Sequence, residues 1–134
     1  MSSERPFFPS GYRIRNVSIA LDWRNLDRIL PRGAGLCLDL GCGTGWLRHL
    51  IEERGYSWIG LDIVKGEGEL SVQGDAHSLP FAGQAFDCVV LNGVLEHLTH
   101  PHQALGEAHR VLKRGGLLCG VVSFTEPFHR SYYH

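Results

Sequence analysis

Residues 36–50 limit the possible folds of this chain more than any other segment. An apolar run at 36–40 carries one acid, Asp39, and glycines then stand at alternate positions, Gly41, Gly43 and Gly45. Apolar residues recur at helical spacing from 46 to 51, with charged residues between them. The order predicts a buried strand, a tight turn that a ligand can approach closely, and a helix. Free N–H groups at the start of that helix favour a ligand with an anionic group.

Strand-like and helix-like patterns alternate along the rest of the chain. Further strands are expected at residues 57–61, 70–73, 86–91 and 117–124. Further helices are expected at residues 18–30 and 101–112, the second one ended by Gly115 and Gly116. The connections are too long for hairpins. The sequence therefore predicts an α/β fold with a doubly wound, mainly parallel sheet flanked by helices, in which the last strand is the fifth.

Composition excludes several classes of function. A chain of 134 residues suits one domain, which we expect at residues 17–134 after an irregular arm at 1–16. A net charge of −1 offers no basic surface for nucleic acid, and no apolar run is long enough to span a membrane. The N-terminus lacks the apolar core of a signal peptide, and no two of the four cysteines form a C-x-x-C pair. We therefore expect a cytoplasmic protein with buried, reduced thiols.

Polar residues gather where the expected strands end. Asp39, Asp62 and Asp75 and the pair Asn92–Gly93 follow four consecutive strands. Open parallel sheets bind ligands at the carboxyl ends of their strands, so four such ends favour a binding site over a set of unrelated turn residues. Asp62 lies 17 residues after Gly45, near the spacing at which an acid binds ribose hydroxyls. The expected ligand therefore contains a nucleoside.

The spacing of the glycines excludes two common nucleotide motifs. The NAD pattern G-x-G-x-x-G/A would need a small residue at 46 or 48, where Trp46 and Arg48 stand. A phosphate-binding P-loop would need Gly-Lys-Ser/Thr after the first glycines, and none follows. The pattern that remains is Asp-x-Gly-x-Gly-x-Gly, from Asp39 to Gly45.

These motifs together resemble those of class I S-adenosylmethionine-dependent methyltransferases, in the type 11-like branch that acts on small molecules. The resembling segments are 38–45 (LDLGCGTG), 60–63 (GLDI), 74–81 (GDAHSLPF), 86–90 (FDCVV) with 95–98 (LEHL), and 107–116 (EAHRVLKRGG). They arrive in the family's order and cover about residues 35–123. The resemblance implies a Rossmann-like fold and S-adenosyl-L-methionine as the cofactor.

The resemblance also implies the residues that bind the cofactor. The methionine part of the cofactor would be held by Asp39, Gly41, Cys42, Gly43, Thr44 and Gly45, and the ribose hydroxyls by Asp62. The adenine would lie against Ile63, Asp75 and Ala76, and the methyl group would be bordered by Asn92 and Gly93.

The implied reaction is an in-line displacement that moves the methyl group to a small-molecule acceptor, and catalysis is largely positioning. His97 is the nearest candidate base for an oxygen or nitrogen acceptor, with packing at a helix start as its other interpretation. The spacing of His97, His100 and His102 matches no standard zinc site, so no metal is expected. The alternative function is a non-catalytic cofactor-binding module, or a fragment, with the same fold.

One departure from the family pattern bears on assembly. The family's domain normally adds two strands after the fifth, whereas ten residues, 125–134, follow the last expected strand here. An open edge at that strand invites pairing with another chain, so we expect either a homodimer through this edge or marginal stability. The tail itself is expected either to line the acceptor site or to lie on the surface.

Overall fold

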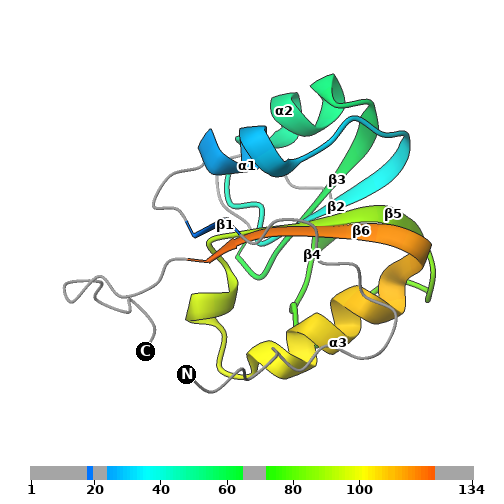
Figure 1. The fold of residues 1–134 in the computed structure, drawn as a ribbon. Coiled ribbons are helices and arrows are strands. Elements are labelled where there is room, and N and C mark those ends of the chain that lie inside the picture. The colour runs from blue at the N-terminus through cyan, green and yellow to red at the C-terminus, as the bar shows by residue number, and fades with distance from the viewer. Residues whose placement is uncertain (1–17, 20–23, 65–71, 123–134) are drawn as a thin grey trace, which may run out of the picture.

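A computed structural model of the chain describes residues 18–19, 24–64 and 72–122, which form one parallel sheet between helices (Figure 1). The strands are β1 (Ser18–Ile19), β2 (Gly35–Leu40), β3 (Tyr56–Asp62), β4 (Val72–Gln73), β5 (Phe86–Asn92) and β6 (Leu112–Val122). The helices are α1 (Arg24–Ile29), α2 (Arg48–Glu53) and α3 (Pro101–Val111), with a short 3₁₀ helix η1 (Leu95–His97). The strand order is β1-β6-β5-β2-β3-β4, and every pairing is parallel. The predicted α/β class is confirmed.

Alternation along the central strands produces two cores, one on each face of the sheet. Cys37 faces a cluster that includes Leu26 of α1 and Ile51 of α2. Its neighbour Leu38 faces the opposite cluster, which includes Ala104 and Ala108 of α3. Figure 1 shows α1 and α2 on one side of the sheet and α3 on the other. Because successive side chains of a strand point to opposite faces, each central strand contributes to both cores.

The four cysteines are buried free thiols, as expected. Burial raises the pKa of Cys119 to about 12 and that of Cys42 also to about 12, so both thiols stay protonated at neutral pH. No helix in the described part of the chain is long and apolar enough to cross a membrane.

The register of β2 places the functional edge of the sheet. Leu40, the last residue of β2, pairs with Leu61 of β3 on one side and with Leu91 of β5 on the other. The chain leaves β2 toward β3 through α2, and β5 lies on the opposite side. The strand order thus reverses at β2, and the carboxyl end of the strands at such a reversal is where doubly wound sheets bind their ligands.

The prediction of a helix at residues 18–30 is wrong at its start. Ser18 and Ile19 form β1, which pairs in parallel with Val121 and Val122 at the end of β6. Backbone pairing with a sheet edge here outweighs the helical spacing of the side chains. The predicted fifth strand is β6, and at its last two residues the edge of the sheet is formed by β1 instead of by β6. Residues 112–120 of β6 have no second strand partner among the described residues.

The expected start of the last strand is also displaced. Helix α3 ends at Val111, one residue before the expected end at 112, but the strand begins at Leu112 instead of at 117, and Leu112 pairs with Phe86 in the sheet. Leu117 pairs with Cys88, so residues 113–116 lie opposite Asp87 alone and form an irregular start to β6. Because the Leu112 side chain is buried in the same core as Phe86, the backbone is extended before the glycines are reached.

The third expected strand is described only as β4, and residues 70–71 lie outside the described residues. The arm 1–16, the tail 125–134 and residues 123–124 of the expected last strand also lie outside them.

Replacement of Gly106 by alanine tests the assignment of α3. Gly106 lies in the exposed middle of this helix, and a Cβ there would meet no atom within 4 Å. We expect Gly106→Ala to raise the free energy of unfolding by about 1 kcal/mol in urea denaturation, because alanine loses less backbone entropy in a helix. A lower free energy of unfolding for Gly106→Ala would contradict the assignment.

Candidate functional site

The glycine loop after β2 is fixed by hydrogen bonds to the end of β3. The N–H groups of Gly41 and Cys42 both donate to the carbonyl oxygen of Leu61, at 2.7 and 3.0 Å. Gly43 N–H donates to the Asp62 carboxylate at 2.8 Å, and Gly45 N–H donates to the Cys42 carbonyl at 2.9 Å. These four donors are satisfied inside the protein. The free N–H groups expected at the start of the following helix are a different set, and these four donors do not test that expectation.

Gly41 has to be glycine for two reasons. Its φ of +75° is rarely adopted by other residues, and a Cβ there would lie 2.6 Å from Cγ2 of Val94. Val94 follows β5, so this contact brings the loop after β5 against the loop after β2. Two of the predicted site segments are thus in direct contact.

Asp62 stands at the rim of the loop, at the end of β3. Its Oδ2 accepts from Gly43 N–H, and its Oδ1 accepts from Val64 N–H at 3.2 Å. A carboxylate oxygen has two lone pairs, so each oxygen can accept one further hydrogen bond. Ile63 and Val64 are 62% and 66% exposed, and they provide an apolar surface next to this carboxylate.

Asp75 is held by His77 in a way that leaves one of its oxygens available. Asp75 Oδ1 accepts from the His77 backbone N–H at 2.9 Å and from His77 Nδ1 at 2.7 Å. The proton lies on Nδ1 because His77 Nε2 accepts from the His100 backbone N–H at 3.2 Å. The backbone donor, followed by the ring donor, lowers the pKa of Asp75, so its carboxyl is ionised at neutral pH. Oδ2 has no partner among the described residues.

Asp39 lies beneath the loop, not on its surface. It is 1% exposed, and its Oδ2 accepts from the indole N–H of Trp58 at 2.9 Å. Burial raises the pKa of Asp39 from 3.8 to about 6, although the indole bond opposes this shift. The Trp58 ring lies against Gly60 and occupies the space that a side chain at 60 would need. The Arg48 guanidinium lies over the same ring, 5.2 Å from its centroid.

Sequence reasoning missed Trp58. The available signal was an indole two residues before Gly60, on the same face of a buried strand. A buried indole N–H needs an acceptor, and Asp39 is the acid on the neighbouring strand.

The segment after β5 carries Asn92, Gly93, Glu96 and His97. Asn92 ends the strand, and Gly93 N–H donates to the Val121 carbonyl at 2.9 Å. The Glu96 side chain is 14% exposed, and its buried Oε2 has no hydrogen-bond partner among the described residues. His97 Nε2 lies 3.9 Å from Glu96 Oε1. His97 therefore sits at the predicted edge of the sheet, beside an acid.

The predicted site residues thus divide by exposure. Thr44 and Asp75 are exposed, Cys42, Ala76 and Asp39 are buried, and Asn92 and Gly93 are intermediate. Carboxylates follow β3, β4 and β5 at one edge of the sheet, and this edge favours a ligand with cationic character. In the described residues no group of three or more histidines, cysteines or acids is arranged to hold a metal ion.

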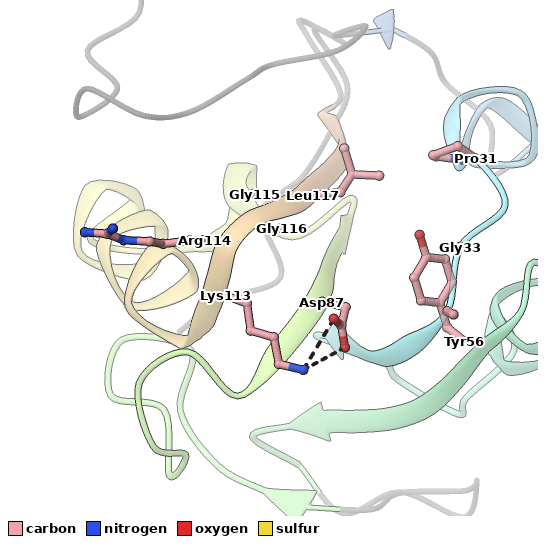
Figure 2. Close-up of a pocket in the computed structure, with 10 residues that line it drawn as sticks. Pro31, Gly33, Tyr56, Asp87, Lys113, Arg114, Gly115, Gly116 and Leu117 are labelled. Carbon is pink, nitrogen blue, oxygen red and sulfur yellow. Dashed lines mark hydrogen bonds and ion pairs between the residues drawn. The ribbon is translucent and has the colours of Figure 1, made fainter.

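A separate cavity of about 650 Å³ lies at the opposite edge, where β2, β3, β5 and β6 begin. Figure 2 shows Lys113 pointing toward Asp87 there, while Arg114 points away from them. Lys113 Nζ lies 3.3 Å from Asp87 Oδ2, which also accepts from Leu36 N–H at 2.9 Å. None of the predicted site residues lines this cavity.

The buried acid predicts a pH-dependent stability. Because folding raises the pKa of Asp39 from 3.8 to about 6, the folded chain binds the proton more tightly than the unfolded chain. The contribution of Asp39 to stability therefore falls as pH rises from about 4 to about 6, by ~3 kcal/mol in total.

Urea unfolding of Asp39→Asn and of the wild type between pH 4 and pH 8 measures this contribution. We expect the variant to gain stability relative to the wild type as pH rises to about 6, and no further change above it. Trp58→Phe removes the indole N–H that donates to the Asp39 carboxylate. The free energy of unfolding of this variant should therefore fall more than that of the wild type as pH rises. A constant difference between Asp39→Asn and wild type over this range would refute the account of Asp39.

Comparison with known proteins agrees with this geometry. A family model described as a methyltransferase domain matches residues 38–120. The ubiquinone/menaquinone biosynthesis C-methyltransferase UbiE of Ruegeria sp. is 32% identical over 133 residues, covering 84% of this chain and 52% of the relative. The chain spans about half the length of the curated relatives it matches.

Solved structures agree as well. An S-adenosylmethionine-dependent methyltransferase from Mesorhizobium loti has a TM-score of 0.59 at 25% identity, over 70% of this chain and 49% of that one. The [4+2]-cyclase SpnF has a TM-score of 0.58 at 28% identity, over 66% of this chain and 38% of that one. The family model alone covers more than half of the sequence. The chain therefore belongs to the class I S-adenosylmethionine-dependent methyltransferase family.

Proposed function

We propose that this chain binds S-adenosylmethionine at the carboxyl edge of its sheet and transfers the methyl group to a small-molecule acceptor. The observation that carries the proposal is the clamped glycine loop with Asp62 beside it, whose oxygens both retain acceptor capacity. Family membership supports the cofactor. A net charge of −1 argues for a small acceptor rather than a nucleic acid.

The side chains fit the groups that the cofactor presents. The two oxygens of Asp62 can accept the vicinal hydroxyls of a ribose, and the exposed Ile63 offers an apolar face to the adenine. Asp75 Oδ2 can accept from the adenine amino group, with the Ala76 backbone beside it. Acids at this edge also suit a sulfonium and an ammonium group.

The remaining site residues act mainly through the backbone. The loop from Gly41 to Gly45, which includes Cys42, Gly43 and Thr44, would line the methionine part, and Asn92 and Gly93 would border the methyl group. Asp39 would support the loop from below through Trp58 rather than touch the ligand. The bound cofactor supplies an activated methyl group, so the task left to the protein is to align the acceptor and to exclude water.

The name of the Ruegeria relative refers to ubiquinone and menaquinone biosynthesis, so quinone precursors are the first acceptors to test. The proposal keeps His97 as a candidate base. It also includes an irregular arm at residues 1–16, a single cofactor-binding domain at residues 17–134, and a cytoplasmic location for the protein.

A second candidate is a cofactor-binding module without methyl transfer by this chain alone. Two observations favour it. The chain spans about half the length of its curated relatives, and a protein of the same fold is named as a cyclase.

The proposal includes a homodimer through the part of the β6 edge that β1 leaves uncovered. Residues 112–120 of this edge lack a second strand partner among the described residues, and such an edge is a template for pairing.

Calorimetric titration of S-adenosylmethionine tests the cofactor site. We expect saturable binding that Asp62→Ala weakens by about tenfold or more, because two hydrogen bonds to a charged acceptor are lost. Asp62→Asn should retain the bond from Gly43 and lie between the two. Glu53→Gln, which alters an exposed acid on α2, is the control and should bind as the wild type does. Equal affinities for Asp62→Ala and wild type would rule out this site.

Sedimentation equilibrium tests whether the chain forms a dimer through the uncovered edge of β6. We expect the wild type to associate into dimers, and Leu118→Pro, placed in β6, to shift the equilibrium toward monomers because proline cannot donate to a strand ladder. Circular dichroism controls for unfolding of the variant. A wild-type monomer with cooperative unfolding at all concentrations would defeat the dimer.

A further inference from the structure

His77 holds the carboxylate of Asp75 with two donors of its own. Asp75 Oδ1 accepts from the backbone N–H of His77 at 2.9 Å and from the ring Nδ1 at 2.7 Å. A carboxylate oxygen has two lone pairs, so these two donors occupy Oδ1 fully. The Asp75 side chain is 52% exposed, and no described residue donates to its Oδ2. The protein therefore presents an exposed carboxylate with one oxygen left to accept hydrogen bonds.

The ring of His77 is in turn held by the start of α3. Its Nε2 accepts from the backbone N–H of His100, the residue that caps this helix, at 3.2 Å. The backbone carbonyl of His77 accepts from the side chain of Gln103 at 2.9 Å. The two histidine rings meet edge to face, with their centroids 5.9 Å apart. Because Nε2 is an acceptor, the ring proton stays on Nδ1, where it is directed at Asp75.

Backbone contacts place Asp75 next to the end of β3. Gln73 pairs with Asp62 in the sheet, and its side chain donates to the Ile63 carbonyl at 3.1 Å. Gly74 N–H donates to the Asp62 carbonyl at 2.9 Å. Asp75 directly follows these two residues. Its carboxylate thus belongs to the same edge as the acid proposed to bind the ribose and the exposed Ile63 proposed to lie against the adenine.

We propose that His77 is a positioning residue that makes this site select a base with an exocyclic amino group, because it fixes Asp75 Oδ2 as the acceptor for that group. This inference rests on the proposed function and assigns a determinant of its base specificity. The backbone donor, and then the ring donor, lower the pKa of Asp75, so the carboxylate is ionised and can only accept. Such a group favours an amino group over a carbonyl oxygen or a C–H at the same place.

Two ligands that differ only in the amino group measure this selection. S-adenosylhomocysteine carries the amino group on its adenine, and its deamino analogue carries a hydrogen atom there. The ribose, the sulfur and the amino acid end are the same in both. The ratio of the two dissociation constants therefore reports on the acceptor of the amino group, whereas a general disturbance of the site changes both constants together.

Two substitutions of His77 separate the two contacts of its ring. An asparagine amide can take the place of Nδ1, and a glutamine amide can take the place of Nε2. His77→Asn can thus keep the side-chain donor to Asp75, whereas His77→Gln keeps only the contact with His100. By calorimetry we expect the wild type and His77→Asn to prefer S-adenosylhomocysteine by about tenfold or more, and His77→Gln by about threefold or less. His102→Gln changes an exposed histidine of α3 in the same way and should keep the wild-type preference.

The ring nitrogens of His77 provide a second measurement that needs no variant. In a ¹⁵N spectrum of the wild type we expect the proton on Nδ1. We also expect the Nδ1 resonance to shift more on binding S-adenosylhomocysteine than on binding the deamino analogue. A ring proton on Nε2 would overturn the inference even if the variants failed to fold.

The other outcomes of calorimetry are equally decisive. A wild-type preference retained by His77→Gln, or lost to the same extent by His77→Asn, would leave His77 with a structural role only. Equal binding of both ligands by the wild type would remove Asp75 from the amino group. Failure of S-adenosylhomocysteine to bind the wild type would instead overturn the proposed function itself.

Discussion

The carbonyl oxygen of Leu61 is the acceptor on which the site depends. It takes the N–H groups of Gly41 and Cys42, and the next residue, Asp62, takes that of Gly43. The end of β3 thereby holds the loop of β2 and at the same time carries the acid proposed to bind the ribose. This coupling fixes the shape of the loop, because three of its N–H groups are bound to the end of β3.

The acids at this edge are held in different states by their surroundings. His77 keeps Asp75 ionised through two donors, whereas burial raises the pKa of Asp39 to about 6, with a single indole donor opposing it. Glu96 has a buried oxygen to which no described residue donates a hydrogen bond. Asp39 and Glu96 carry a folding cost that packing alone does not require, which is typical of residues kept for function.

Much of the fold follows from local patterns, and the departures have a common cause. Alternating glycines predicted the turn after β2, and acids at strand ends predicted which residues meet at one edge. The periodicity of the sequence predicts a helix at Ser18 and Ile19, because their pairing with Val121 and Val122 is distant in sequence and leaves no periodic signal. The same holds for Leu112, which Phe86 draws into the sheet, and for the bond between Trp58 and Asp39. Side-chain partners across strands are set by register, which no single segment encodes.

The most direct test of the central claim is a nuclear magnetic resonance titration of the ¹⁵N-labelled chain with S-adenosylhomocysteine. The backbone N–H groups of Gly43 and Val64 report on Asp62, and that of His77 reports on Asp75. The account predicts that these three resonances shift with one shared dissociation constant, while that of Leu36, bound to Asp87 at the opposite edge, stays unchanged. Shifts confined to Leu36 and its neighbours, or no shifts at all, would contradict it.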